Sequence, residues 1–292
     1  MAAWLCLCAA ATAASPPDPP AACPSDDPQP SIRIDGQPLP PAPSSPHSLP
    51  DRSVRLRQIH SELQLTYVHS FLSAEELHEL VALADARGGW ASSPLKDQRE
   101  GEARNVRGAA EDERRNSSSC PMLWPVAYAA RRAELAHKPG LLRELDLTTR
   151  LSNRVVSLFT STGLPITSAH IEPLQLLRYQ PTERFGPHHD YHATGKSSVQ
   201  GEQRAFTFLL FGSTLPPEAG GETHFPWLNL SVSPQLGDGL VWANVDSEGE
   251  PNPRSLHEGR PPTHGEKIAI NVWVTDRAFD LGNGMDNAIR SG

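Results

Sequence analysis

The pattern of apolar and polar residues changes its period near the middle of the chain. In the first half, Ser73-Ala74-Glu75-Glu76 has the form of a helix capping box. Apolar residues then recur at helical spacing as far as Gly88-Gly89. We therefore expect a helix between these two signals. A second helix is expected over residues 145–161, where the apolar residues form a single stripe.

Later segments change to a period of two, or are short apolar runs rich in β-branched residues. They predict strands over residues 174–179, 205–211, 239–243 and 267–274, with an earlier strand over 63–68. Glycine, proline, asparagine and aspartate separate these strands. Helices first and many short strands later predict an α+β, mainly β fold, in which helices pack on one face of a sandwich or open barrel. Residues 96–120 are charged and rich in Gly and Ser, so we expect a loop there.

Composition divides the chain further. Of its 29 prolines, 13 fall within the first 50 residues. Residues 15–52 are therefore predicted to form a disordered or polyproline-II stalk. Residues 1–14 resemble a signal peptide, with a short apolar run and an A-x-A pattern. They lack the usual positive charge, since Arg33 is the first basic residue, so an Ala-rich disordered tail is the alternative. A folded domain over 53–280 and a flexible tail over 281–292 complete the organisation.

Charge and short motifs bear on the binding partners and the cellular location of the protein. The net charge is -8 and no basic block is present, which argues against nucleic-acid binding. Beyond the N-terminus, no stretch is apolar enough to cross a membrane. Two sequons, at Asn116 and Asn229, fit a glycoprotein of the endoplasmic reticulum or Golgi lumen. Cys23 and Cys120 would remain after signal removal, and both their pairing and the oligomeric state stay open.

Histidines and one carboxylate cluster after the strand at 174–179. His188 and Asp190 are two residues apart, which puts both side chains on one face of a strand. His257 lies 257 - 188 = 69 residues downstream. Two histidines and one carboxylate form the facial triad of non-haem Fe(II) oxygenases. His189 and His192 remain rivals, because Asp190 and His192 have the same spacing in reverse.

Lys267 opens a strand pattern ten residues after His257. Alternation places it on one face with Ala269, Asn271 and Trp273. If this face points inward, the ammonium needs an anion, and a dicarboxylate would supply one. If the face is exposed to solvent, Lys267 needs no partner, and the strand alone favours that alternative because lysines are mostly exposed.

Six segments occur in a specific order. They are residues 174–179 (LQLLRY), 187–191 (PHHDY), 220–223 (GGET), 238–242 (DGLVW), 254–259 (RSLHEG) and 265–267 (GEK). In this order they resemble the catalytic domain of prolyl 4-hydroxylases, especially of the plant and algal type. The resemblance extends more loosely over residues 63–276. The departures are Phe185 for a usual Tyr, His189 for an aromatic, Ile268 for Trp and Arg260 for Cys.

This resemblance implies a double-stranded β-helix (jelly-roll) core with N-terminal supporting helices. It implies iron ligands at His188, Asp190 and His257, and it places Lys267 on the distal carboxylate of 2-oxoglutarate. Further positions that line the cosubstrate pocket in the family are Tyr179, Thr223 and Trp273. The cofactors implied are Fe(II), 2-oxoglutarate and O2, with ascorbate as the reductant.

The resemblance also implies an activity, which is hydroxylation of peptidyl proline to 4-hydroxyproline with release of succinate and CO2. The expected partner is a proline-rich or hydroxyproline-type polypeptide. Because the departures lie nearer the peptide than the metal, an oxygenase for Lys or Asn/Asp side chains or for a small molecule is the alternative. A non-catalytic barrel that binds peptides or glycans is the remaining class.

Overall fold

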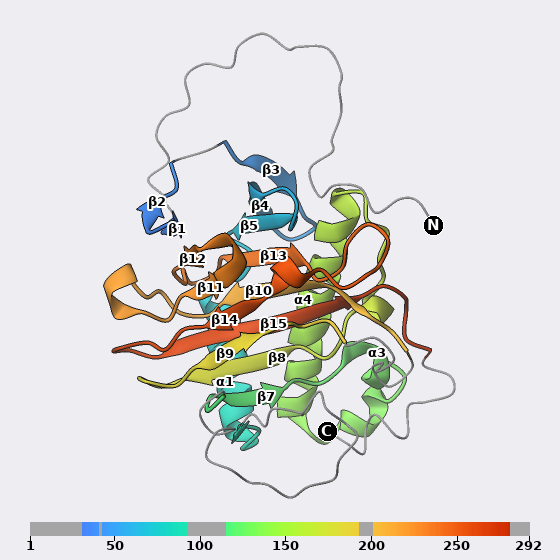
Figure 1. Cartoon of the computed structure of the whole chain (residues 1–292). Coiled ribbons are helices and arrows are strands. Elements are labelled where there is room, and N and C mark those ends of the chain that lie inside the picture. The colour runs from blue at the N-terminus through green and yellow to red at the C-terminus, as the bar shows by residue number, and fades with distance from the viewer. Residues whose placement is uncertain (1–30, 41–42, 93–114, 193–200, 281–292) are drawn as a thin grey trace, which may run out of the picture.

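The computed structural model describes residues 31–40, 43–92, 115–192 and 201–280. In these ranges the chain forms two antiparallel sheets that face each other, with helices on the outer face of the larger one. Figure 1 shows the long helix α4 crossing behind that sheet. The prediction of an α+β, mainly β fold with helices on one face is confirmed.

The larger sheet has nine strands in the described ranges. Their spatial order is β3 (Ser45–Ser48), β4 (Ser53–His60), β5 (Leu65–His69), β13 (Gly239–Ala243), β10 (Arg204–Phe211), β15 (Lys267–Thr275), β8 (Gln175–Tyr179), β7 (Ser118–Pro121) and β6 (Ala91–Ser92). All five strands predicted from the sequence are present, within two residues of the expected bounds.

The smaller sheet has six strands in the described ranges. Their order is β2 (Gln37–Pro38), β1 (Ile32–Ile34), β12 (Leu230–Val232), β11 (Thr223–Phe225), β14 (His257–Gly259) and β9 (Phe185–His188). The strands that carry the candidate ligands His257 and His188, β14 and β9, are neighbours at one edge of this sheet.

Both predicted helices form. α1 (Ala74–Ala86) begins at the expected capping box, in which the Glu76 amide donates to the Ser73 hydroxyl and the Ser73 amide donates to the Glu76 carboxylate. α4 (Pro139–Ser161) begins six residues earlier than predicted, because proline is well tolerated in a first helical turn. The other described helices are α3 (Pro125–Tyr128) and the 3-10 helices η1 (Arg132–Leu135), η2 (Ser168–His170), η3 (Pro217–Ala219), η4 (Pro226–Leu228) and η5 (Pro253–Ser255).

Two hydrophobic cores lie on opposite faces of the larger sheet. One fills the space between this sheet and the helices, and contains Leu80 of α1, Val155 of α4 and Val272 of β15. The other lies between the two sheets, and contains Phe225 of β11 and Trp242 of β13. Central strands such as β15 are therefore buried on both faces, so the side of β15 that carries Lys267 is not exposed to solvent.

The prediction of a disordered stalk over 15–52 is wrong for residues 31–40 and 43–52. Ile32 is 2% exposed and packs into the core between the sheets. It lies opposite Val232 in the β1–β12 pair, so a strand about 200 residues away supplies the contacts that the local composition lacks. Residues 15–30, the predicted signal peptide, Cys23 and the tail from residue 281 lie outside the described residues.

The predicted loop over residues 96–120 is wrong at its C-terminal end. Residues 118–121 form β7, which pairs with β8. Cys120 of this strand is fully buried, which explains why a segment rich in serine becomes a strand. Residues 93–114 lie outside the described ranges.

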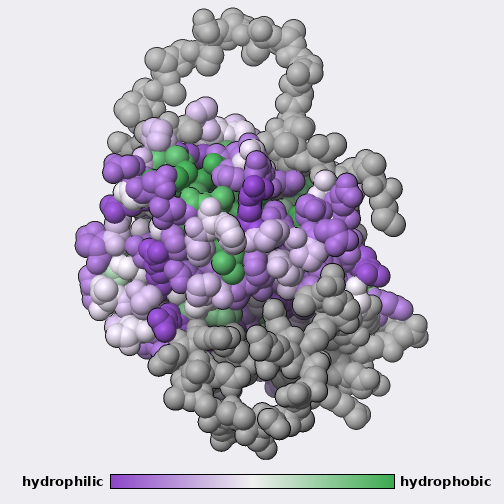
Figure 2. Space-filling model, in the orientation of Figure 1, coloured by the Kyte–Doolittle hydropathy of each residue, from purple (hydrophilic) through white to green (hydrophobic). Residues whose placement is uncertain are grey.

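Most of the described surface in Figure 2 is hydrophilic, and apolar residues gather only in small areas of this view. The one large hydrophobic side chain among the described residues that is strongly exposed is Trp227, at 68%. Within the described ranges, none of the helices combines the length and apolar composition needed to cross a bilayer.

A buried ion-pair network joins the helices to the larger sheet, and we expect it to matter for stability. Arg154 of α4 donates to Asp51 at 3.0 Å, to Glu76 at 2.7 Å and to the carbonyl of Phe71 at 2.9 Å. Arg154→Met should lower the free energy of unfolding by about 2 kcal/mol, below the ~3–5 kcal/mol of a fully buried pair because Asp51 is partly exposed. Urea unfolding checks this, with Arg143→Met on the exposed face of α4 as control. Equal losses in the two variants would contradict it.

Candidate active site

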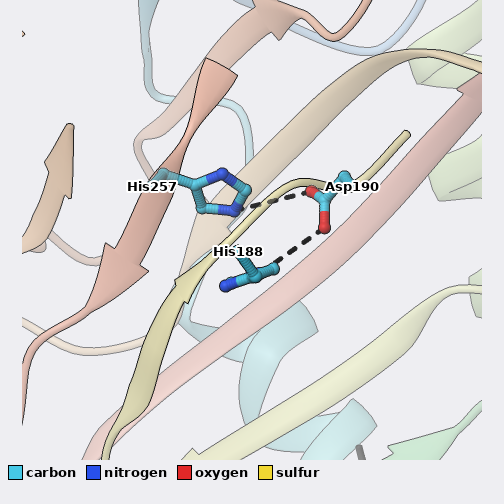
Figure 3. A group of neighbouring side chains, drawn as sticks. All are labelled: His188, Asp190 and His257. Atoms are coloured by element: carbon cyan, nitrogen blue, oxygen red, sulfur yellow. Dashed lines mark ion pairs between the residues drawn. The ribbon is translucent and has the colours of Figure 1, made fainter. Parts of the chain in front are cut away.

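The pairing of β9 with β14 brings the first candidate ligands together. His188 lies directly opposite His257 in this pair, and Asp190 follows two residues after His188, just beyond the end of β9. The Asp190 carboxylate lies between the two rings: Oδ1 is 3.5 Å from Nε2 of His188, and Oδ2 is 3.6 Å from Nε2 of His257. Figure 3 shows the three side chains converging from the two segments.

Backbone carbonyls orient both histidine rings. Nδ1 of His188 is 2.9 Å from the Gly186 carbonyl, and Nδ1 of His257 is 2.9 Å from the Ser255 carbonyl. A carbonyl can only accept, so each Nδ1 carries the proton and each Nε2 presents a lone pair toward Asp190. This is the tautomer that a metal ligand needs.

The protonation states suit metal binding. Burial, followed by the neighbouring His188, lowers the pKa of His257 to about 4, so this imidazole is neutral near pH 7. Burial acts to raise the pKa of Asp190, but the neighbouring His257, His188 and Arg204 hold that pKa below its ordinary value. The site thus offers two imidazole nitrogens and one carboxylate as donors to a metal ion.

The structure brings three of the five candidate ligands together. Among the described residues, the one cluster able to hold a metal ion is His188, Asp190 and His257, whose ligand atoms lie within 4.8 Å of one another. The His189 ring instead contacts the Ser255 hydroxyl at 3.2 Å. His192 is not part of the cluster either, and Gln203 bonds to both its amide and its carbonyl.

A buried cation lies beside this cluster. Lys267 is 2% exposed, and lines one cavity with His188 and His257. Burial lowers its pKa from 10.5 to about 8, an effect that Glu222 partly offsets. Its Nζ is 5.1 Å from the ring centroid of Tyr179, the residue opposite it in the β15–β8 pair. The low exposure of Lys267 shows that the solvent-exposed alternative is wrong. No carboxylate of the described residues forms a salt bridge with it, so the ammonium needs an external anion.

Other features of the cavity fit a dicarboxylate. The Thr223 hydroxyl is buried and has no partner among the described residues. A Cβ at Gly259 would lie 3.4 Å from the Tyr179 hydroxyl and 3.5 Å from Nζ of Lys267, so glycine keeps this space free. The triad itself is the donor set of non-haem Fe(II) oxygenases. The residues present therefore fit both Fe(II) and an anionic cosubstrate.

Comparison with known proteins supports the same conclusion. Residues 174–275 match the model of the 2OG-Fe(II) oxygenase superfamily. Prolyl 4-hydroxylase 1 of Arabidopsis thaliana is 32% identical over 120 residues, which are 37% of this chain and 42% of that protein. The alpha-3 subunit of prolyl 4-hydroxylase of Homo sapiens is 35% identical over 128 residues, 42% of this chain and 22% of that one. Residues 174–275 are thus similar to 2OG-Fe(II) oxygenases, and the relatives named above are prolyl 4-hydroxylases.

A solved structure supports the fold of the chain. A viral collagen prolyl hydroxylase from Paramecium Bursaria Chlorella virus-1, in complex with 2OG, matches with a TM-score of 0.50 at 21% identity. The match covers 72% of this chain and 95% of that one. The predicted jelly-roll core is thus confirmed. The chain spans less than half the length of the two relatives named above.

The other predicted pocket residues divide into two groups. Tyr179 and Thr223 line the same cavity as Lys267. Trp273 is not among the lining residues. Its ring instead lies under the guanidinium of Arg204, 3.5 Å from the ring centroid, and Arg204 forms an ion pair with Glu172 at 2.7 Å.

Sequence reasoning missed a stack on the outer side of the site. The Phe185 ring lies nearly parallel to that of His188, with centroids 3.5 Å apart. The guanidinium of Arg115 lies 4.1 Å from the Phe185 centroid. The backbones of Arg115 and Phe185 are joined by an isolated antiparallel β-bridge. Phe185 stood out only as a departure from the family pattern. Arg115 is 70 residues away in the sequence, and no local signal indicates their contact.

Proposed function

We propose that this chain hydroxylates peptidyl proline to 4-hydroxyproline, using Fe(II), 2-oxoglutarate and O2 and releasing succinate and CO2. The observation that supports it most directly is the His188–Asp190–His257 cluster next to the unpaired ammonium of Lys267. A metal donor set and an anion receptor in one cavity are what a metal-dependent enzyme with a dicarboxylate cosubstrate requires.

Each residue has a proposed role. His188, Asp190 and His257 hold Fe(II), which when bound supplies the activation of O2 for oxidising a C–H bond. The ammonium of Lys267 binds the distal carboxylate of 2-oxoglutarate, and the free hydroxyl of Thr223 provides a further hydrogen bond. Tyr179 packs against the Lys267 side chain and keeps water away from that ion pair. Ascorbate is proposed as the reductant that maintains Fe(II).

The substrate proposal rests mainly on the relatives named prolyl 4-hydroxylase. Proline-rich segments are already extended and enter grooves at low entropic cost. The second candidate is an oxygenase for Lys, Asn or Asp side chains or for a small molecule, which the unusual Phe185 and His189 beside the triad favour. A non-catalytic barrel is disfavoured, since a buried lysine without an anion destabilises the fold.

Succinate release distinguishes these candidates. The full chain is incubated with 2-oxoglutarate, with and without Fe(II), and with a poly-proline, a collagen-like or a Lys-containing peptide. We expect Fe(II)-dependent succinate release coupled to one added oxygen on proline, detected by mass spectrometry. Oxidation of another side chain alone would support the second candidate. No succinate with any peptide, and no Fe(II) binding, would contradict an oxygenase.

Cosubstrate affinity should depend on pH through Lys267. Since its pKa in the cosubstrate-free protein is about 8, the ammonium needed for carboxylate binding is lost as the pH rises through 8. The dissociation constant for 2-oxoglutarate should increase by on the order of tenfold between pH 7.5 and 9. Calorimetry on the Mn(II)-loaded protein measures this. Lys267→Arg, which keeps its charge in this range, should show a flat profile, and a flat wild-type profile would contradict the role of Lys267.

We also propose that the protein enters the secretory pathway and works in the endoplasmic reticulum or Golgi lumen. The apolar residues 1–14 and two exposed sequon asparagines, Asn116 and Asn229, support this. A glycan on Asn229 would lie next to Trp227, which exposes 68% of its surface, and would replace the hydrogen bond from Nδ2 of Asn229 to Asp35. A glycosidase-sensitive mass shift that Asn229→Gln removes would support this, whereas a chain that stays in the cytosol of the expressing cell without a glycan would contradict it.

A further inference from the structure

Three buried side chains outside the triad form a continuous chain of hydrogen bonds that ends on Asp190. The indole Nε1 of Trp242 donates to Oδ1 of Asn244 at 3.0 Å, and Nδ2 of Asn244 donates to Oγ1 of Thr207 at 2.8 Å. The Thr207 hydroxyl then donates to Oδ2 of Asp190 at 2.7 Å. Thr207, Asn244 and Trp242 are each 0% exposed, so water cannot replace any of these bonds.

The chemistry of the groups fixes the direction of every bond. An indole N–H can only donate, so the Asn244 side chain must present its oxygen to Trp242 and its NH2 group to Thr207. The Thr207 oxygen accepts from that NH2, which leaves its single proton for the Asp190 carboxylate. An indole in the core thus determines which way a hydroxyl points in the metal site.

Trp242 also contacts a second ligand directly. Its ring lies edge-on to that of His257, with centroids 4.7 Å apart, and edge-on to Phe225 at 5.3 Å. Trp242 lies opposite Thr207 in the β13–β10 pair, so the sheet register holds both residues in place. Both the rigid sheet and the packing oppose rotation of His257 and Asp190.

We propose that Thr207, Asn244 and Trp242 are positioning residues of the metal site, which orient Asp190 for metal binding through one oxygen. This inference rests on the proposed function, since it concerns the same Fe(II) site. The Thr207 proton occupies Oδ2 and draws electron density from it, so Oδ1 is the better metal ligand.

Mn(II) affinity, measured by calorimetry on the full chain, tests the proposal. Thr207→Val removes the hydroxyl at nearly constant volume and should weaken Mn(II) binding by about 10–100-fold, the usual cost of losing a hydrogen-bond partner of a metal ligand. Thr207→Ser keeps the hydroxyl and should stay within about threefold of wild type. Trp242→Phe keeps the ring beside His257 but removes the N–H, and should weaken binding by about fivefold.

A double variant separates positioning from simple loss of stability. If Trp242 acts through Thr207, adding Trp242→Phe to Thr207→Val should not weaken Mn(II) binding further, although the melting temperature can fall. Equal affinities of Thr207→Val, Thr207→Ser and wild type would overturn the positioning role. If Thr207→Val does not fold, Trp242→Phe decides, and wild-type affinity there overturns the proposal.

These outcomes remain distinct from failure of the proposed function. A wild-type protein that binds Mn(II) and releases succinate, with a Thr207→Val variant that binds equally well, overturns only the positioning role. A wild-type protein that binds no Mn(II) overturns both.

Discussion

Replacing Asp190 by alanine is expected to abolish metal binding and 2-oxoglutarate turnover together. Asp190 is the only anionic member of the triad and lies between His188 and His257, with an oxygen 3.5 or 3.6 Å from each ring. It is 6% exposed, so no water or outside carboxylate readily takes its place. The loss of Fe(II) affinity should exceed about a hundredfold, the upper end of what loss of an outer hydrogen-bond partner costs.

The readout for this variant must separate metal binding from folding. Loss of the carboxylate also leaves the Thr207 hydroxyl without its acceptor, which costs about 1–3 kcal/mol. We therefore compare melting temperatures with and without Mn(II). Wild type should gain stability from the metal, and Asp190→Ala should not. Asp146→Ala, an exposed carboxylate on α4, is the control and should behave as wild type. Retained Fe(II)-dependent succinate release in Asp190→Ala would refute the ligand assignment.

Local sequence patterns were sufficient to predict those helices and strands that are stabilised by residues close in the sequence. The capping box at Ser73 predicted the start of α1 to the residue, and alternation predicted β15 to within one residue. The same patterns could not choose between His188, His189 and His192. The choice depends on strand pairing, because His257 is opposite His188 across two strands that are far apart in sequence.

The features that sequence reasoning missed all depend on distant contacts. Ile32 forms a strand in a proline-rich region because β12 supplies its partner. Thr207 and Asn244 are ordinary strand and strand-end residues in the sequence, 37 positions apart, and only the fold joins them to Asp190. Trp273 matches a family pocket position, yet the guanidinium of Arg204 covers its ring.

The arrangement of layers explains why the site lies where it does. Helices α1 and α4 cover one face of the larger sheet with apolar contacts, so this face contributes nothing to the chemistry. The opposite face carries Lys267, Tyr179 and Thr207 toward the smaller sheet, whose edge strands β9 and β14 bring the histidines. Polar residues in this interior are tolerated where each has a partner. Among the described residues of this cavity, the ammonium of Lys267 and the hydroxyl of Thr223 are exceptions, and they are the groups that a bound dicarboxylate would satisfy.

Replacing Lys267 by methionine should therefore stabilise the cosubstrate-free protein while it impairs cosubstrate binding. The ammonium is 2% exposed and its pKa falls from 10.5 to about 8, which corresponds to a cost of about 3 kcal/mol at pH 7. That cost is present in full below pH 8 and disappears as the pH rises from 8 to 10.5, because the folded state then loses its proton before the unfolded state does. Methionine removes it and retains the apolar stem.

The affinity of Lys267→Met for 2-oxoglutarate should fall, although the cosubstrate-free protein is more stable. Without the ammonium, the KM for 2-oxoglutarate should rise by about a hundredfold, consistent with loss of one partner of a buried ion pair, while kcat changes less. Thermal melts at pH 7 should show a higher Tm for the free Lys267→Met variant than for wild type, and no further rise on adding 2-oxoglutarate to the Mn(II)-loaded form. Lys138→Met, at an exposed lysine, should match wild type in both. An unchanged KM in Lys267→Met would show that another group binds the distal carboxylate, and an unchanged Tm would show that the buried ammonium already has a partner.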